Sequence, residues 1–374
     1  MRRRVLLAIA CLTSVAALVA IVALFRGGAA KSAHGAAEAR WANASAVAAA
    51  FLHRYVEPDG RVVRTDQGGD TVSEGQAYAM LLAVVDHDPG TFERVWGWTR
   101  ENLRRPNGLL AWHWEDGQVV STESAADADL DAAWALLLAS ERLGEPAYKG
   151  EALALANAVL EHETVSLDGR SLLVAGDWAT RFPAVVDPSY FAPAAFAALG
   201  RASGDPRWRQ LQATSQDVLD QLTEGPTGLA PDWAVVEADG EAKPTAPPGE
   251  GGEASFGYDA VRVPLWQARG CAAGGARLAG GARLAGGMES FFDETATAHP
   301  AATYSLEGEP RGGSPGAPML VAAAMASAGA GNARGAANWM RGAEVDVKVA
   351  PTYYGMALLA LGRAALEPEG ALGC

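Results

Sequence analysis

Basic residues are scarce in this chain, and their scarcity excludes one class of ligand. The 374 residues include 30 Lys and Arg against 44 Asp and Glu, a formal net charge of −14 at pH 7. Proteins that bind nucleic acid need clustered Lys and Arg to neutralise the phosphates. The charge balance therefore predicts no nucleic-acid partner and favours a neutral or cationic ligand.

Cysteine and histidine are also few. The three cysteines are Cys11, Cys271 and Cys374, and at most one disulfide could join the last two, so no disulfide framework stabilises the fold. The six histidines form neither an H-E-x-x-H motif nor a Cys/His cluster. The sequence therefore predicts no zinc site.

A long apolar run lies near the N-terminus. Residues 5–25 are apolar and follow three arginines, and their length is close to the ~20 residues that span a bilayer. The arginines predict a cytoplasmic N-terminus, while the small residues that follow leave cleavage of a signal segment as the alternative. We expect residues 1–36 to be a membrane anchor or signal segment with its linker, and residues 37–374 to be one exported domain, periplasmic or extracellular. Only the N-terminal segment is expected to contact the membrane.

Helical periodicity recurs through the rest of the chain, and strand patterns are brief, near 109–117, 171–178 and 230–238. Short connections alternate with long ones that carry Trp, Gly and Asp. This pattern predicts an all-α fold, an (α/α)6 barrel of six helical hairpins with a few short strands in long loops on one face; a two-domain α protein is the alternative. The twelve predicted helices lie near 41–56, 73–86, 89–104, 127–143, 145–162, 187–203, 205–223, 257–272, 276–293, 316–328, 332–341 and 351–366.

Two stretches have the composition of insertions. Residues 238–255 are rich in Pro, Gly and Glu, which predicts a mobile loop. Residues 274–287 repeat a six-residue unit, and its glycines should weaken the helix that contains it. Neither stretch carries residues with obvious chemistry.

Glu74 opens a strongly apolar helix in the stretch SEGQAYAML. A structural explanation is available, because Ser73 could cap the helix and Gln76 would complete an S-x-x-Q capping box. Glu74 would then lie in the first turn, where the helix dipole favours a negative charge. The alternative is a functional carboxylate at the mouth of the helix.

Three aspartates, Asp127, Asp129 and Asp131, open a second apolar helix. A calcium loop of the EF-hand type is excluded, because Ala132 and Leu138 stand where Gly and Glu are needed. Compensation of the helix dipole accounts for Asp131. Three acids exceed what a cap needs, so Asp127 or Asp129 should have another function.

A third acid, Asp259, follows Tyr258 and precedes Arg262 by three residues. On a helix Asp259 and Arg262 would share a face, either as a structural ion pair or with the arginine holding the carboxylate oriented and ionised. Glycoside hydrolysis needs one carboxylic acid and one carboxylate, and the 11 tryptophans offer flat surfaces for sugar rings. The three acid-bearing junctions therefore indicate a glycosidase if they converge.

Seven motifs, in chain order, resemble glycoside hydrolase family 8 over residues 45–366, most of all the endoglucanases associated with bacterial cellulose synthesis. The resemblance implies an (α/α)6 barrel that cleaves β-1,4-glucan chains internally with inversion, without a metal or other cofactor. Chitosan, lichenan or xylan are the alternative substrates. The motifs are TVSEGQAYAMLLAV, GLLAWHW, ADADLDAAWALLLA, DPSYFAP, GLAPDWAVV, GYDAVRVPLW and YYGMALLAL.

Carried over by motif, Glu74 resembles the general acid, Asp259 the general base, and Asp127 the residue that binds and helps distort the sugar. Two departures concern the site: Ala126 removes a hydroxyl beside Asp127, and Asp187 replaces the more usual Asn. The positions that line the family's subsites are Trp112, Trp178, Tyr190, Tyr258, Arg262 and Tyr353, with Trp114 and Trp233 as weaker candidates that more often pack.

The sequence bears on three rival functions. A serine hydrolase is excluded, because the GGSPG match places Pro315 where a backbone N–H is needed. A sugar epimerase would need paired catalytic histidines, and the histidines stand in unrelated contexts. A non-catalytic glucan-binding accessory of a polysaccharide synthase stays open, although it has no need for both Glu74 and Asp259. We expect a monomer that acts on polysaccharide, and the resemblance leaves a cellulose synthase complex open as a partner.

Overall fold

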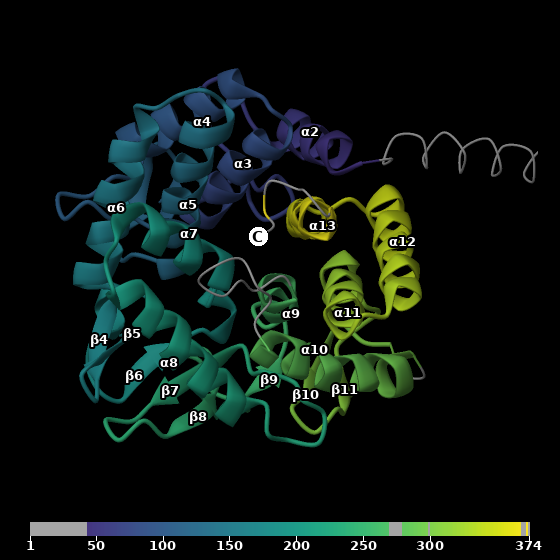
Figure 1. The fold of residues 1–374 in the computed structure, drawn as a ribbon. Helices are drawn as coiled ribbons and strands as arrows, with labels where there is room; N and C mark the ends of the chain where they lie inside the picture. Colours follow the sequence, from purple (N-terminus) through teal and green to yellow (C-terminus); the bar gives the residue numbers. More distant parts are fainter. Residues whose placement is uncertain (1–42, 269–278, 298–299, 368–371, 373–374) are drawn as a thin grey trace, which may run out of the picture.

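A ring of helical hairpins forms the body of the protein (Figure 1). The computed structural model describes residues 43–268, 279–297, 300–367 and 372. Within these ranges the chain forms twelve α-helices. They are α2 (Ala44–Tyr55), α3 (Ser73–Val85), α4 (Pro89–Asn102), α5 (Ala126–Arg142), α6 (Tyr148–His162), α7 (Pro193–Ser203), α8 (Arg207–Leu222), α9 (Arg262–Gln267), α10 (Ala279–Phe291), α11 (Ala317–Ala330), α12 (Ala333–Val349) and α13 (Tyr353–Leu366).

The odd-numbered helices form the inner ring of the barrel. Helices α3, α5, α7, α9, α11 and α13 pack in that order, and α13 closes the ring against α3. The even-numbered helices lie outside them, each packed against an inner helix (Figure 1). The predicted (α/α)6 barrel is therefore confirmed, and the two-domain alternative is wrong.

Burial explains the two rings. Every residue of α3 except Glu74 is buried, as expected for a helix that is apolar on all sides. Helix α12 instead buries one stripe, which includes Ala336, Met340, Ala343 and Val347. This spacing of three and four residues is typical of a helix with one face on the core and one in solvent.

Four small antiparallel sheets lie in the connections that lead from an outer helix to the next inner one. Within the described residues, short turns connect each inner helix to the outer helix that follows it. The long loops therefore gather on one face, at the N-terminal ends of the inner helices, as predicted. The sheets are β1 (Thr71–Val72), β2 (His113–Glu115) and β3 (Gln118–Ser121); β4 (Thr164–Leu167) and β5 (Arg170–Leu173); β6 (Ala184–Val186), β7 (Trp233–Val236) and β8 (Ala242–Thr245); and β9 (Ser255–Phe256), β10 (Thr303–Ser305) and β11 (Pro310–Arg311).

All twelve predicted helices are present, but three of them differ most from their predicted bounds, and the one predicted at 257–272 is reduced to Arg262–Gln267. The helix predicted from 187 begins as a 3-10 turn, η2 (Pro188–Tyr190), before α7. The helix predicted from 257 begins only at Arg262, because the carboxylate of Asp232 accepts the backbone N–H groups of residues 257, 259 and 260 and holds them in a turn. The helix predicted to end at 341 continues to Val349.

The predictions for the two insertions and the N-terminus have different outcomes. Residues 242–245 are not a loop, since they pair with β7 as the edge strand β8. The repeat at 274–287 lies partly outside the described residues, and from Ala279 onward it is helical. The apolar run 5–25 lies wholly outside them. Among the helices that the structure does describe, none has the length and hydropathy of a membrane span.

Candidate active site

The predicted acids meet at one end of the barrel, where the inner helices begin. Glu74 lies in the first turn of α3 and Asp127 in the first turn of α5. Asp187 caps η2 ahead of α7, and Asp259 lies in the turn before α9. Segments up to 188 residues apart in the chain thus deliver carboxyl groups to one place.

Arg262 joins these four carboxyl groups. Its Nη1 donates to Glu74 Oε2 at 2.6 Å and to Asp127 Oδ2 at 2.9 Å. Its Nη2 donates to Asp259 Oδ1 at 2.9 Å and to Asp187 Oδ2 at 3.4 Å. The side chain is 2% exposed. The predicted convergence of Glu74, Asp127 and Asp259 is confirmed, and the predicted pair of Asp259 with Arg262 is one contact of a larger cluster.

One guanidinium cannot neutralise four carboxylates, so the cluster retains protons. Burial raises the pKa of Glu74 to about 7; Arg262 opposes this shift, and Asp127 and Asp259 add to it. Burial also raises the pKa of Asp127, and it raises the pKa of Asp187 well above its usual range. Charged groups withdrawn from water are stable only when paired. At neutral pH some carboxyl groups here are therefore neutral acids, able to donate a proton.

Asp259 is held differently from the other three acids. Its Oδ1 accepts from Arg262 and its Oδ2 accepts from the indole N–H of Trp233 at 3.0 Å. Its backbone N–H donates to Asp232 Oδ1, also at 3.0 Å. The side chain is nonetheless 37% exposed. Asp259 therefore combines a fixed position with access to solvent.

The predicted capping box at Ser73 is wrong. The N-cap of α3 is Val72, and the Ser73 hydroxyl is buried without a hydrogen-bond partner. The reason is that Ser73 already belongs to the helix, while its backbone N–H donates to Trp112 O at 2.9 Å. The side chain of Gln76 turns inward and bonds Val62 N and Thr99 Oγ1. Glu74 is thus left without a cap function, and it reaches the site from the first turn of α3, one turn before Tyr78, whose hydroxyl accepts from Arg262 Nη1 at 3.3 Å.

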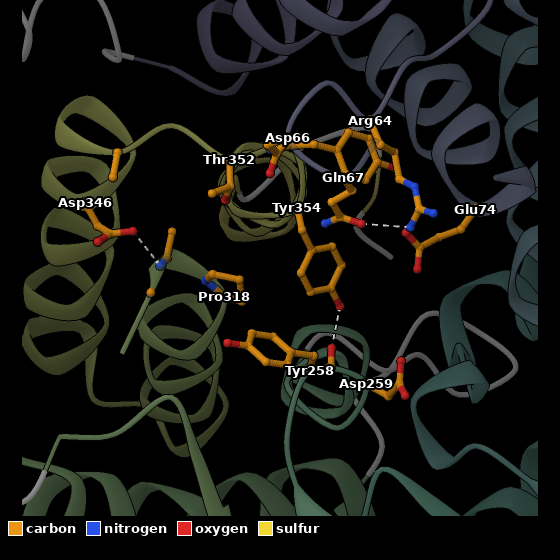
Figure 2. Close-up of a pocket in the computed structure, with 14 residues that line it drawn as sticks. Arg64, Asp66, Gln67, Glu74, Tyr258, Asp259, Pro318, Asp346, Thr352 and Tyr354 are labelled. Carbon is orange, nitrogen blue, oxygen red and sulfur yellow. Dashed lines mark hydrogen bonds between the residues drawn. The ribbon is translucent and has the colours of Figure 1, made fainter. Parts of the chain in front are cut away.

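A cavity of about 690 Å³ opens beside the acids, and Figure 2 shows its lining. Glu74 and Asp259 lie on one side of it, and the hydroxyl of Tyr354 crosses its wall to donate to Tyr258 O at 2.6 Å. Arg64 lies next to Glu74 and donates to Gln67 Oε1 at 2.9 Å. The cavity is open to solvent and large enough for sugar residues of a chain.

Three of the predicted aromatic residues have accessible rings near the site. Trp112 is half-buried, stacked on His113 with ring centroids 4.6 Å apart. Trp178 and Tyr258 are exposed, at 37% and 58%. Their surfaces suit stacking on sugar rings.

The other predicted positions are buried. Tyr190 lies under the guanidinium of Arg262, 5.4 Å from ring centroid to carbon, so it forms the floor of the acid cluster. The ring of Tyr353 is 1% exposed and packs against Phe51 and Tyr55, which closes it to stacking on a sugar.

Sequence reasoning undervalued three residues. Trp233 was expected to pack, but its indole binds Asp259. Tyr354 lines the cavity beside its predicted neighbour Tyr353. Asp232 fixes the turn that carries Asp259, and burial raises its pKa to about 6. The motif APDWAVV contained a signal for Asp232 and Trp233. The same Asp–Trp pair occurs at Asp177 and Trp178, at the end of another predicted strand. Trp114 does pack, edge-on against Trp98.

The run of three aspartates divides by function. Asp127 contacts Arg262, as its predicted additional function requires. The prediction that Asp131 offsets the helix dipole is wrong, because it lies beyond the first turn and burial raises its pKa well above the usual range. A neutral acid does not offset a dipole. In the described residues no group of three His, Cys, Asp or Glu side chains is arranged to hold a metal ion.

Comparison with known proteins identifies the family. The family model described as "Glycosyl hydrolases family 8" matches residues 30–278, more than half of the chain. The chain belongs to glycosyl hydrolase family 8. The matched segment contains Glu74, Asp127, Asp259 and Arg262, whereas Tyr353 and Tyr354 lie beyond it.

Relatives and solved structures within family 8 are similar to the chain over different lengths. An endoglucanase of Cellulomonas uda is 32% identical over 58% of this chain and 61% of its own, and an endoglucanase of Escherichia coli (strain K12) is 33% identical over 58% and 60%. The chain thus aligns with about three fifths of these curated relatives. The endo-β-1,4-glucanase CMCax from Acetobacter xylinum is 27% identical and superposes with a TM-score of 0.72 over 86% of this chain and 96% of that one.

Proposed function

We propose that this family 8 member is an endo-acting, inverting β-1,4-glucanase. One observation carries the proposal: Glu74 and Asp259 bind the same guanidinium at the floor of an open cavity, and their surroundings differ. The acid with the raised pKa suits proton donation, and the carboxylate with fixed donors and solvent access suits a base. The names of the relatives favour a β-1,4-glucan as substrate.

In the proposed reaction Glu74 donates its proton to the glycosidic oxygen as the bond from the anomeric carbon breaks. A water molecule attacks that carbon from the opposite face and loses a proton to Asp259. The configuration inverts because the water and the leaving group occupy opposite faces. Glu74 then regains a proton from solvent and Asp259 releases one, which restores the starting state.

Asp127 and Arg262 are proposed to act on the sugar at the cleavage point. Asp127 Oδ2 is bound by Arg262, while Asp127 Oδ1 accepts from Ala128 N at 2.8 Å. The carboxyl is therefore rigid, and a rigid acceptor can hold a distorted ring better than a flexible one. Arg262 would hold Asp259 in position while Glu74 retains its proton.

The shape of the cavity supports attack within a chain. Trp178 and Tyr258 are exposed rings on separate loops, and Tyr258 lines the cavity itself, so they can extend the binding surface beyond the acids. Such a surface accepts the interior of a glucan, whereas a closed pocket would accept only an end. We further propose that residues 37–374 act as one exported monomeric domain, carried out of the cytoplasm by the N-terminal segment.

The direct test is NMR of the first products released from a soluble β-1,4-glucan oligosaccharide. We expect the α-anomer first, because inversion of a β-linkage produces it. Initial release of the β-anomer would contradict the proposal. Reducing-end release from carboxymethylcellulose, chitosan, lichenan and xylan identifies the substrate class, and binding without any release would identify a non-catalytic accessory.

Replacing the base tests the assignment of Asp259. Asp259→Asn keeps the size and loses the basicity, so turnover should fall by roughly 10²–10⁴-fold, with little change in affinity because the aromatic surfaces remain. Asp239→Asn, on an exposed turn, is the matched control and should leave turnover unchanged. Near-normal turnover in Asp259→Asn would exclude this residue as the base.

A further inference from the structure

A second pair of buried acids lies behind the candidate site. Asp129 lies on α5, two residues after Asp127, and Glu163 is the C-cap of α6; both are 0% exposed. Each side chain acts directly on the pKa of the other, so the two acids are neighbours. Two ionised carboxylates side by side in a dry interior repel each other, so this arrangement favours one proton between them.

Each acid has one oxygen fixed by a donor from elsewhere. Asp129 Oδ1 accepts from Leu110 N at 2.9 Å, and Glu163 Oε1 accepts from Ser124 Oγ at 2.6 Å. The other two oxygens, Asp129 Oδ2 and Glu163 Oε2, are buried and receive no other N–H or O–H. These two oxygens are therefore the pair that a shared proton would join.

Ser124 links this pair to the substrate side of the protein. Its hydroxyl, already donating to Glu163, accepts from Asp177 N at 3.0 Å, and its carbonyl accepts the indole N–H of Trp178 at 3.2 Å. Little room is left for movement, because a Cβ at Gly176 would come within 2.3 Å of Ser124 O. The orientation of the exposed Trp178 ring therefore depends on where Ser124 is held.

We propose that Asp129 and Glu163 share one proton and act through Ser124 as positioning residues for the Trp178 sugar-binding surface. Loss of the proton would leave two negative charges next to each other in a dry interior. Their repulsion would push the two side chains apart. Ser124 would then lose its hydrogen bond to Glu163 and be held only from the Asp177 side. The Trp178 ring, which is bonded to the Ser124 carbonyl, would shift with it. The inference rests on the proposed function only in the part that assigns glucan binding to Trp178.

The charged surroundings favour retention of the proton. Burial raises the pKa of both acids well above their usual range, and Asp127 near Asp129 and Asp177 near Glu163 add to it. Arg105 opposes the shift at Asp129, but its Nη2 is bound to Asp177 Oδ2 at 2.8 Å. No lysine or histidine is among the main charges that act on the pair.

The first experiment detects the shared proton by the pH dependence of unfolding, and it needs no glucan. Unfolded glutamate loses its proton near pH 4.3, while the folded pair keeps one, so the wild-type unfolding constant should rise with pH across neutrality. Glu163→Gln supplies an amide N–H in place of the shared proton, so this contribution disappears. Denaturant unfolding over a pH series should show the constants of the two proteins diverging by roughly tenfold per pH unit. Equal slopes would overturn the shared proton.

The second experiment measures binding of a soluble β-1,4-linked glucose hexamer by calorimetry in a Glu74→Gln background. Glu163→Ala should raise Kd by roughly 3–10-fold, the effect of a misplaced aromatic contact, whereas Glu163→Gln should bind normally and keep its affinity to more alkaline pH than the parent. Glu161→Gln, exposed on α6, is the control. In the otherwise wild-type enzyme Glu163→Ala should raise KM and leave kcat within about twofold.

The outcomes separate this inference from the proposed function. Equal affinity of Glu163→Ala and its parent would overturn the positioning of Trp178. If Glu163→Ala does not fold, Asp129→Asn combined with Glu163→Gln, which keeps an N–H···O bond between the two side chains, should bind normally, and a loss of affinity there overturns the inference as well. Absence of hexamer binding by the wild-type protein would refute the proposed function, while the unfolding experiment would still decide on the proton.

Discussion

The starts of α3 and α9 both deliver a carboxylate to Arg262, and they do so in opposite ways. Glu74 is part of a helix whose other residues are all buried, so its position and its dry surroundings come from the helix itself. Asp259 lies in a turn before a short helix and is held by Trp233, which opens β7, and by Asp232, which precedes it in the same connection between α8 and α9. Burial sets the protonation of the first acid, and hydrogen bonds set the position of the second.

The comparison also ranks two electrostatic effects. A carboxylate in the first turn of a helix is stabilised by the dipole by about 0.3–1 kcal/mol, which lowers its pKa. The pKa of Glu74 is instead raised to about 7 by burial. Desolvation therefore outweighs the dipole at the start of α3.

Replacing Glu74, the proposed acid, should cause the largest loss of turnover. Glu74→Gln keeps the hydrogen bond to Arg262 but has no proton to give, so kcat should fall by roughly 10²–10⁴-fold. In the wild type kcat/KM should fall as the pH rises through about 7, because Glu74 then loses its proton. A pH–rate profile of the variant should lack this limb. Glu93→Gln, exposed on α4, should match the wild type, and an unchanged limb in Glu74→Gln would refute the assignment.

Replacing Arg262, the cation that Glu74 and Asp259 share, should affect both acids at once. Arg262→Met removes the cation from four carboxyl groups, of which Asp127 and Asp187 are buried, and loss of one partner of a buried ion pair costs about 3–5 kcal/mol. We expect a decrease of that size in the free energy of unfolding at pH 7, measured by denaturant titration. The decrease should shrink as the pH is lowered through about 7, since the acids then become neutral. Arg209→Met on the exposed face of α8 is the control, and a pH-independent loss would contradict the account.

Removing one hydrogen bond to Asp259 should cause an intermediate loss of turnover. Trp233→Phe keeps the ring against Tyr190 and removes the N–H that binds Asp259 Oδ2. Hydrogen bonds to charged groups contribute about 1.5–3 kcal/mol, so we expect a loss of roughly 10–100-fold in kcat. The limb near pH 7 should persist, because Glu74 is untouched. The same change at Trp114, which packs away from Asp259, should alter stability more than turnover.

Neutralising Asp187 should have the smallest effect. Because its raised pKa already keeps it protonated at neutral pH, Asp187→Asn replaces one neutral group by another, and turnover at pH 7 should change by less than about threefold. The native state holds this proton and the unfolded state does not, so stability falls as the pH rises. The variant lacks this fall and should be the more stable protein at alkaline pH in thermal unfolding. A large loss of turnover would show that Asp187 works as an anion.

Much of this site could be predicted, because the helices and the acids at their starts are local features. Glu74, Asp127 and Asp259 each precede or open a strongly periodic apolar segment, and the alternation of loop lengths places such starts on one face. The contacts of Arg262 could not be predicted beyond Asp259, since its other partners lie up to 188 residues away.

The less accurate predictions concern helix starts, where a shift of one residue changes which side chain is buried or which residue caps the helix. Tyr353 and Tyr354 are neighbours at the start of α13 and both line the cavity, but packing of Tyr353 on α2 buries it, whereas Tyr354 stays partly exposed. Ser73 fits a capping motif, but pairing of Val72 in the sheet with β2 moves the cap one residue earlier. Sequence pattern carries no information about either constraint.

Closure of the ring has a consequence for how the chain could be rearranged. Helix α13 packs against α2, and Ala44 N donates to Glu367 Oε1 at 2.8 Å, so the first and last described helices lie side by side. An open solenoid needs special end repeats to cover its terminal faces, but here each end covers the other. A circular permutant that joins the end of α13 to the start of α2 and is cut at the α7–α8 turn should therefore keep every inner helix between its two neighbours. Deletion of one hairpin, in contrast, would expose two apolar faces that have no other partner.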